Sequence, residues 1–269
     1  MAAIQNLLLA SLPHREYQKL LPGLTPVTLE FGSVLFETGD RMRDVYFPGG
    51  SLVSLLKLVE THQALEVGMV GQEGMIGVPL ALGVDVTEVR ALVQGGGPAL
   101  RMTGAKFRNA LRRSPALRRA VNAYILVLIG QISQTAACNR FHVVDARLAR
   151  WLLMTRDRLQ TGEFRMTQDF LSHMLGVRRE GVTEAASGFQ RRKLIEYSRG
   201  QIVILDHRGL EAAACSCYKL SGTGSKAIAP WRPTVHRVSR VAPAARPPLR
   251  RPRNPGIAVR RIAADPILS

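Results

Sequence analysis

The chain has 269 residues, of which 46% are hydrophobic and 21% charged, and its formal net charge is +17. This length and composition leave room for two modest domains with buried cores, which excludes a protein that is disordered throughout. Its three cysteines are too few for a secreted disulfide framework, and no uncharged apolar run approaches the roughly 18 residues of a membrane span. We therefore expect a cytoplasmic protein without a membrane partner.

The first part of the chain predicts short helices followed by a β-rich domain. Helical patterns cover 4–12 and 16–21. Short strands separated by glycine or proline turns follow at 27–30, 34–36, 44–47, 52–58, 64–69, 86–93 and 99–102. Such even spacing is typical of a sandwich or roll. Residues 103–111 then return to a helical pattern.

A long helix is expected from Pro115 onward, because proline is favoured in the first turn of a helix. Its apolar residues recur at three- and four-residue steps and form one stripe: Leu117, Val121, Tyr124, Ile125, Leu128, Ile132 and Ala136. A stripe of this length can form a coiled-coil-like seam with a second copy of the chain, so it predicts a homodimer interface. The alternative is that the stripe packs only on the β-rich domain of its own chain.

Residues 139–142 predict a hinge, and residues 143–159 predict an amphipathic helix that begins the next domain. One face of this helix is apolar and is expected to cover the core of that domain. Its arginines are expected on or near solvent: Arg147, Arg150, Arg156 and Arg158.

The most informative stretch is 167–195, where two helical patterns follow one another across a Gly-Val break. Thr167 is placed to cap the first helix, and Gly176 is suited to end it. The second helix starts near Arg178, and its outward residues are Arg178, Arg179, Glu180, Thr183 and Glu184. This order is that of a helix-turn-helix, whose second helix reads the major groove of DNA. The alternative is an ordinary amphipathic helical hairpin with a solvated charged face.

The side chains at the start of the second helix suit the edges of a G·C pair. Arg179 can donate two hydrogen bonds to O6 and N7 of guanine, and Glu180 can accept one from the N4 amine of cytosine. Arg178 or Thr183 better suits a phosphate. Thr167, Gln168 and Glu184 are the other residues of the two helices that we predict to lie at the DNA.

Two short strands are predicted after the second helix, at 194–197 and 201–205, around a tight turn at Arg199 and Gly200. A helix-turn-helix followed by a β-hairpin is a winged arrangement. We expect Arg199 at the tip of the wing, near the phosphates.

From about Gln5 to Tyr218 the chain resembles the Crp/Fnr family of bacterial transcription regulators, and the helix-turn-helix is the most specific part of the resemblance. Arg179 and Glu180 fall on the base-reading Arg-Glu pair of the family. Glu184 stands where the best-known members have a further arginine, so the operator sequence of the family does not carry over. The resemblance implies a homodimer that binds a palindromic operator in double-stranded DNA, with RNA polymerase as a candidate further partner.

The resemblance also implies an α+β fold with a jelly-roll sensor domain, a long dimerisation helix and a C-terminal winged helix-turn-helix. We place the cyclic-nucleotide-binding-like sensor domain at 1–113, the dimerisation helix and hinge at 114–142, and the DNA-binding domain at 143–218. A tail at 219–269 follows.

The residues expected for a cyclic-nucleotide pocket are altered in the sensor domain. Such a pocket needs a carboxylate for the ribose and an arginine beside a small hydroxyl residue for the phosphate. Val78-Pro79 stand where the family pattern has Gly-Glu, and Arg90 is shifted by one residue from the expected Arg-Ser-Ala. We therefore expect no binding of cyclic AMP. Glu73 and Arg90 are candidate residues for an unidentified small-molecule effector, with a structural salt bridge or a solvated loop as the alternative.

No enzyme, cofactor or metal site is predicted. The Gly95-Gly96-Gly97 run lacks the Lys and Ser/Thr of a phosphate-binding loop. Three cysteines do not supply the four ligands of an iron-sulfur cluster, Cys215-Ser216-Cys217 is isolated, and the lone histidines are expected to be structural: His62, His142 and His173. The alternative function is a ligand-binding or protein-interaction module whose helical hairpin contacts a protein rather than DNA.

Residues 219–269 hold eleven Lys/Arg and one Asp, or +10, together with eight prolines, and this composition predicts a disordered basic tail. The rest of the chain carries +7, from twenty-six Lys/Arg and nineteen Asp/Glu. Two interpretations stay open. The tail is either a basic arm for non-specific DNA binding or an out-of-frame extension of a GC-rich coding sequence.

Overall fold

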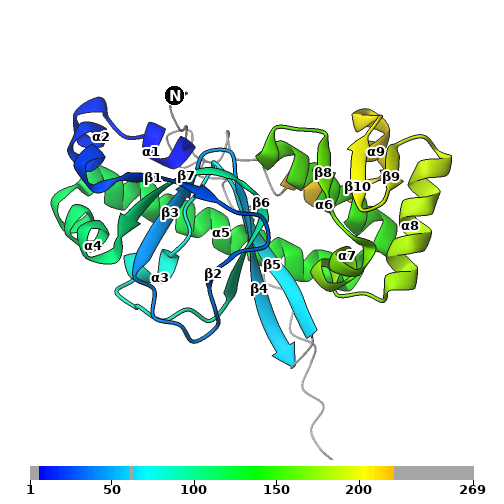
Figure 1. Cartoon of the computed structure of the whole chain (residues 1–269), viewed down its shortest axis with the longest axis horizontal. Helices are drawn as coiled ribbons and strands as arrows, with labels where there is room; N and C mark the ends of the chain where they lie inside the picture. Colours follow the sequence, from blue (N-terminus) through cyan, green and yellow to red (C-terminus); the bar gives the residue numbers. More distant parts are fainter. Residues whose placement is uncertain (1–5, 61–62, 221–269) are drawn as a thin grey trace, which may run out of the picture. The chain divides into compact units, whose positions relative to one another are not determined.

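The N-terminal part of the chain forms short helices that lead into a roll of β-strands (Figure 1). The computed structural model describes residues 6–60 and 63–220. The side chain of Asn6 caps helix α1 (Leu7–Ala10) and donates to two backbone carbonyls of the roll. Helix α2 (His14–Leu20) and the 3-10 turn η1 (Leu21–Gly23) follow. The predicted basic tail from residue 221 onward lies outside the described residues.

The roll consists of two antiparallel sheets, with strand orders β1-β7-β3 and β2-β6-β4-β5. Its strands are β1 (Thr25–Leu29), β2 (Val34–Phe36), β3 (Asp44–Pro48), β4 (Leu52–Glu60), β5 (Gln63–Val70), β6 (Arg90–Gly95) and β7 (Gly97–Thr103). The first four residues of β3 and β6 alternate between half-buried and buried positions, because one face of each sheet covers the core. The predicted α+β fold with antiparallel sheets is confirmed. The strand predicted at 86–93 begins only at Arg90.

Two helices pack on the roll. The short α3 (Val78–Ala81) was not expected from the sequence, whereas α4 (Gly104–Arg113) matches a predicted helix. Phe107 of α4 meets Phe47 of β3 edge-on, with ring centroids 6.3 Å apart. Aromatic pairs favour this geometry.

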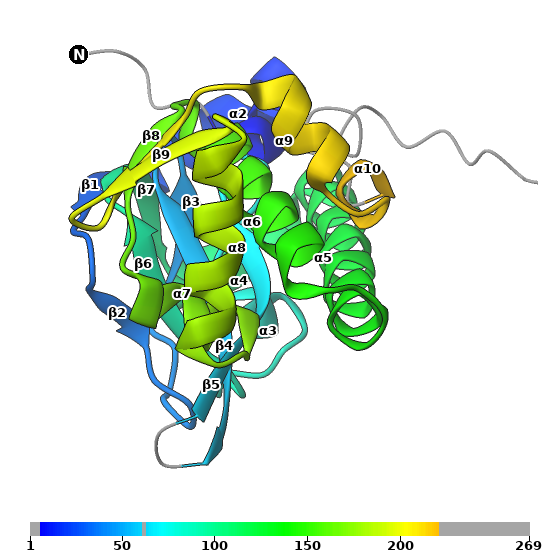
Figure 2. The same ribbon diagram turned by 90° about the vertical axis from the view of Figure 1, so that its right-hand side faces the viewer.

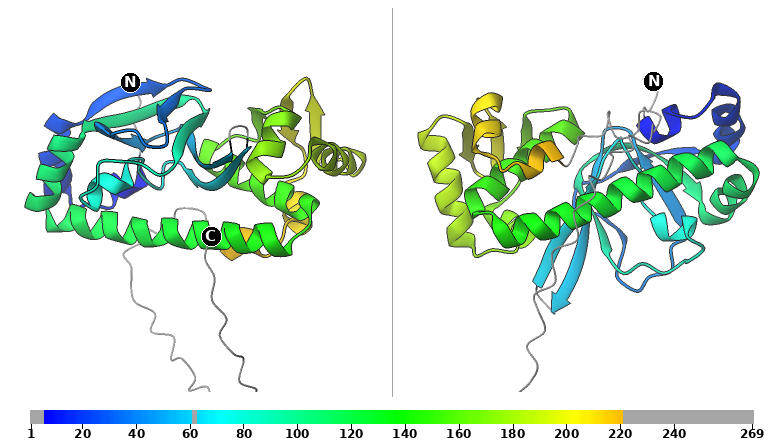
Figure 3. Two further views of the ribbon diagram at one scale, coloured as in Figure 1. Left: turned by 90° about the horizontal axis from the view of Figure 1, so that it is seen from below. Right: turned by 180° about the vertical axis from the view of Figure 1, so that it is seen from behind.

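Helix α5 (Pro115–Phe141) runs alongside the roll, and its C-terminal end contacts α10 (Figure 3). The Ser114 side chain accepts from the backbone N–H of Leu117, which caps the helix. Most of the predicted dimer stripe packs on the roll of its own chain, as in the alternative interpretation: Leu117, Val121, Tyr124 and Leu128 are buried in the core of the roll, and Ile125 packs against that core. Two members of the predicted stripe, Ile132 and Ala136, are exposed, Ile132 at 37%.

A second face of α5 is apolar and exposed. Leu126 and Ile129 have relative exposures of 59% and 55%, and they lie three residues apart on the helix. By length and composition alone, α5 is long and apolar enough to cross a membrane. In this structure 28% of its most apolar 18-residue segment is buried. The sequence contains no uncharged apolar run of about 18 residues, because polar side chains interrupt the apolar ones. The mean hydropathy of α5 is nevertheless high enough over such a length. Core helices of soluble proteins meet the same criterion.

The C-terminal part contains a helix-turn-helix and a three-stranded wing sheet of order β8-β10-β9. Its elements are α6 (Val144–Leu159), β8 (Glu163–Arg165), α7 (Gln168–Leu175), α8 (Arg179–Arg191), β9 (Ile195–Ser198), β10 (Gln201–Ile204), α9 (His207–Ala213) and α10 (Cys217–Leu220). Figure 2 shows α8 and the wing on the side that faces the viewer.

The structure adds one strand to the elements predicted for the C-terminal part and shortens the hinge. Strand β8 was not predicted, because three residues are too few to show alternation. The hinge is shorter than 139–142, since α5 continues to Phe141 and only His142 and Val143 separate it from α6. After the wing, α9 stops at Ala213 and the separate helix α10 begins at Cys217.

Most of the arginines of α6 are buried, contrary to the sequence prediction. Arg147, Arg150 and Arg158 have exposures of 8%, 7% and 4%. Arg147 donates to the carbonyl of Leu175 in α7, and Arg150 lies 3.3 Å from the hydroxyl of Thr135 in α5. Arg147 and Arg150 thus connect α6 to α7 and to α5.

Buried polar contacts also join α6 to the roll. Arg158 Nε lies 2.7 Å from Glu73 Oε1, and both side chains are less than a tenth exposed. Trp151 Nε1 donates to Glu66 Oε1 of β5 at 3.0 Å. Helix α7 packs on the same strand.

Candidate DNA-binding site

The first helix of the helix-turn-helix, α7, begins and ends as the sequence predicts. The Thr167 side chain accepts from the backbone N–H of Phe170 at 3.1 Å, which satisfies a free donor of the first turn. Gly176 ends the helix in the left-handed conformation, with φ of 59°. The same glycine faces the roll, where an added Cβ would lie 2.7 Å from Leu65 Cδ1.

The second helix, α8, buries one stripe and exposes the other. Its buried residues are Val182, Ala185, Ala186 and Phe189. Two alanines on this stripe let α8 approach the domain core closely. Glu180 in the first turn also suits the positive end of the helix dipole.

The predicted DNA-facing residues of α8 all lie on its exposed side: Arg178, Arg179, Glu180, Thr183 and Glu184. The hydroxyl of Thr183 lies 2.9 Å from Oε1 of the half-buried Gln168, so it links α8 to the start of α7. This contact gives Thr183 a partner within the protein. Arg179, the first residue of α8, is exposed.

The wing tip lies beside the start of α7. Arg199 and Gly200 form the turn between β9 and β10 with φ of 49° and 78°, and Arg199 is exposed. The backbone N–H of Met166 donates to the Gly200 carbonyl at 2.6 Å. The structure therefore brings Arg199 close to Thr167, although they are far apart in sequence.

Tyr197 holds the wing against the domain. Its hydroxyl donates to the Met166 carbonyl at 2.7 Å. Burial raises the pKa of Tyr197 to about 12, so the phenol stays protonated and remains a hydrogen-bond donor.

The two candidate effector-binding residues are not brought into a shared ion pair. Glu73 is paired with Arg158 of α6, whereas Arg90 Nε lies 2.8 Å from Glu37 Oε2. Glu73 and Arg90 each form a salt bridge within the protein, which agrees with the alternative that they are structural residues and not effector ligands. Tyr124 of α5 fills the space beside Gly74, and its ring is buried.

A buried carboxylate that the sequence did not single out lies between the roll and α6. Glu66 accepts from Ser54, from Gln94 at 3.3 Å and from Trp151 at 3.0 Å. Burial raises the pKa of Glu66 to about 7, against the opposing effect of these hydrogen bonds.

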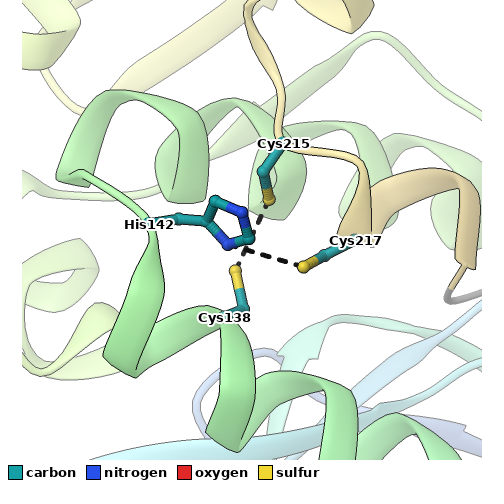
Figure 4. Close-up of side chains that lie close together, drawn as sticks. All are labelled: Cys138, His142, Cys215 and Cys217. Atoms are coloured by element: carbon teal, nitrogen blue, oxygen red, sulfur yellow. Dashed lines mark hydrogen bonds between the residues drawn. The ribbon is translucent and has the colours of Figure 1, made fainter.

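The structure also brings together residues that the sequence treated as unrelated. Cys138 and His142 of α5 converge with Cys215 and Cys217 (Figure 4). Burial raises the pKa of Cys138 to about 12 and also raises the pKa of Cys215. The sequence signal was the four-residue spacing of Cys138 and His142, which puts both side chains on one face of a helix.

Known proteins share both the helix-turn-helix and the fold. Residues 146–213 match the family model of the Crp-like helix-turn-helix domain. No curated protein sequence matches the chain.

Among solved structures, the chain is similar to a Eubacterium rectale protein assigned to the Crp/Fnr family of transcriptional regulators. The identity is 17%, the TM-score is 0.60, and the match covers 77% of this chain and 96% of that one. FixK2 from Bradyrhizobium japonicum is 15% identical, with a TM-score of 0.62 and coverage of 72% and 98%. A CRP/FNR-family transcriptional regulator from Thermus thermophilus is 20% identical, with a TM-score of 0.58 and coverage of 71% and 98%. Residues 146–213 thus form a Crp-like helix-turn-helix domain, and the chain shares the fold of these solved Crp/Fnr-type structures.

Proposed function

We propose that the protein acts as a homodimer on a palindromic DNA operator and that α8 enters the major groove. The observation that carries this proposal is the exposed first turn of α8, where Arg179 and Glu180 lie side by side on the second helix of the helix-turn-helix. A recognition helix reads base edges with its N-terminal residues. Arg179 donates to guanine, Glu180 accepts from cytosine, and Arg178 holds a phosphate.

The surrounding residues position the protein on the DNA backbone. Arg199 at the wing tip supplies a positive charge to a phosphate beside the start of α7. Thr167 and Gln168 lie at that start, and the Gln168–Thr183 contact fixes the two helices of the motif. Glu184 is exposed on α8 and repels phosphates, so it selects against a backbone contact at its position.

The dimer forms through the exposed apolar face of α5, not through the stripe that packs on the roll. Leu126, Ile129 and Ile132 lie on one side of this long helix, and their exposures are 59%, 55% and 37%. A second copy of the chain would cover this face. It would also place a second α8 on the next half-site, about 34 Å along the DNA.

We infer that the protein works in the cytoplasm, without catalysis, and in contact with RNA polymerase at promoters. We propose an effector other than cyclic AMP, because Glu73 and Arg90 are engaged in separate salt bridges. The buried Glu73–Arg158 pair makes the roll and α6 respond together to any such ligand.

The test uses DNA duplexes that the full chain enriches from a randomised pool. We expect an enriched palindrome with a G·C pair in each half-site. Arg179→Ala should weaken binding to the enriched duplex by about 1–3 kcal/mol and leave binding to a scrambled duplex nearly unchanged, since only the first depends on a base contact. Fluorescence anisotropy at fixed salt measures both affinities.

The matched control is Arg108→Ala, which removes an exposed arginine from α4 of the roll. This variant should bind both duplexes as the unaltered chain does. Equal losses on both duplexes for Arg179→Ala would refute base reading. Absence of any enriched sequence, with no dependence of binding on salt, would instead favour the protein-interaction alternative.

A further inference from the structure

The whole cysteine content of the chain gathers with one histidine at the junction of α5 and the C-terminal segment (Figure 4). Cys138 and His142 come from the last turn of α5 and the residue after it. Cys215 lies in the short connection from α9 to α10, and Cys217 is the first residue of α10. The four potential ligand atoms all lie within 4.8 Å of one another.

The distances in this cluster fit a single tetrahedral metal ion. Cys138 Sγ lies 3.5 Å from Cys215 Sγ, and Cys217 Sγ lies 3.5 Å from His142 Nδ1. Zinc bonds of about 2.3 Å to sulfur and about 2.0 Å to nitrogen separate tetrahedral ligand atoms by about 3.5–3.8 Å. An ion could therefore bind with small side-chain movements.

The surroundings also suit a thiolate-bound cation. The three cysteines have exposures of 0%, 8% and 2%, and they form a small cluster separate from the two large cores. Gln134 Nε2 lies 2.9 Å from Cys217 Sγ, the position of a supporting N–H···S hydrogen bond.

Two other chemistries explain the cluster less well. A disulfide between Cys138 and Cys215 would require their sulfurs to close from 3.5 Å to about 2.05 Å and would leave Cys217 and His142 without a reason to converge. An iron-sulfur cluster would spread its ligands over more than one iron, whereas these four atoms all lie within 4.8 Å of one another.

We propose that Cys138, His142, Cys215 and Cys217 form a structural Zn²⁺ site. Three thiolates and one imidazole make a closed tetrahedral set of the kind that zinc prefers. The ion would join the end of the long helix to the end of the DNA-binding domain. It closes a loop that contains the helix-turn-helix and the wing, so it restricts how far the domain moves from α5.

The experiment measures metal in the full chain, purified under reducing conditions without added metal and also after dialysis against zinc. Inductively coupled plasma mass spectrometry should find one zinc per chain. Cys217→Ser and His142→Ala should lose it, whereas His142→Cys should keep it, because a four-cysteine set also binds zinc. The control is His14→Ala, which removes an exposed histidine of α2 and should keep the full zinc content.

Cobalt gives a readout that depends on coordination and not on folding alone. Full-length protein reloaded with Co²⁺ should show the visible bands of a tetrahedral ion and a thiolate charge-transfer band. Both should be present in His142→Cys and absent in Cys217→Ser. Circular dichroism confirms that each variant compared is folded.

Three results would overturn the proposal. One is substoichiometric zinc in the folded, unaltered chain after dialysis, and another is the absorbance of an iron-sulfur chromophore. The third is a Cys138–Cys215 disulfide in protein kept anaerobic and analysed by mass spectrometry. None of these readouts involves DNA, so the zinc site and the DNA-binding proposal fail independently.

Discussion

At the scale of single residues, Glu66 shows how burial sets the charge of a side chain. Its carboxyl group is enclosed between the roll and α6 and receives hydrogen bonds from Ser54, Gln94 and Trp151. Burial has the larger effect, and the pKa of Glu66 rises from 4.5 to about 7. The group therefore changes its charge near neutral pH.

We predict that Glu66 makes the protein less stable as the pH rises. The folded state holds the proton up to about pH 7, whereas an unfolded glutamate releases it near 4.5, so the folded state binds more protons in this interval. The contribution of Glu66 to the free energy of unfolding is therefore largest below pH 4.5 and decreases as the pH rises to about 7. This group alone should contribute a difference of up to about 3 kcal/mol between pH 5 and pH 8.

Urea unfolding followed by tryptophan fluorescence at pH 5 and pH 8 measures this difference. Glu66→Gln should reduce it, since glutamine does not titrate. Glu88→Gln, which changes a side chain that is 85% exposed, should leave the difference as it is in the unaltered chain. Equal pH dependence in all three proteins would disprove the assignment.

Residue-level predictions from the sequence succeeded where the neighbours are local. Thr167 and Gly176 act as the caps that their positions indicated, because a cap depends on residues within one turn. The α6 arginines were misplaced, since the partners that bury Arg147 and Arg158 come from α7 and the roll. Periodicity along one helix contains no information about those partners.

At the scale of elements, the contact between α5 and the roll depends on a glycine. Gly74 leaves room for the buried ring of Tyr124, and an added Cβ would lie 2.2 Å from that ring. Gln131, two turns further on, accepts from the backbone N–H of Met69 at 2.6 Å and so fixes the register of α5 on β5.

We expect Gly74→Ala to destabilise the protein by at least about 1–3 kcal/mol, because the tight packing must shift to admit a methyl group. Gly188→Ala is the matched control. It lies inside α8, where an added Cβ has ordinary contact at 3.8 Å, so it should raise stability by up to about 1 kcal/mol through helix propensity. Thermal unfolding by calorimetry gives both shifts. A Tm for Gly74→Ala equal to that of the unaltered chain would contradict the packing.

The element order of the roll and of the winged helix-turn-helix was predictable because strand and helix periods are local. The face of α5 that packs on the roll was not predictable from the sequence. The helix is apolar on more than one side, so the sequence allows either Tyr124 or Ile129 to lie in a helix interface. Packing on the roll buries Tyr124 and leaves Ile129 exposed. The four zinc-ligand candidates were equally hidden, since Cys138 and Cys215 lie 77 residues apart in the chain.

At the scale of the whole molecule, helix α5 carries an exposed apolar face formed by Leu126, Ile129 and Ile132. We predict that Ile129→Asp converts a dimer into a monomer, because the charge would have to be buried in the interface. Sedimentation equilibrium at micromolar concentration measures the mass. Specific DNA affinity should fall in parallel, since two half-sites are then no longer bound together.

Leu82→Asp places the same charge on an exposed apolar position of the roll, which is 63% exposed, and should leave the mass unchanged. A monomeric unaltered chain that still binds its palindrome with full affinity would rule out this dimer.

Gly176 imposes a second condition on the turn of the helix-turn-helix. Asparagine commonly replaces glycine in a left-handed cap, since it tolerates a positive φ. At this position it would satisfy the dihedral angle and still collide with Leu65 of the roll. Position 176 therefore favours glycine for two independent reasons: the left-handed turn of the helix-turn-helix, and the close contact of this turn with the hairpin of the roll.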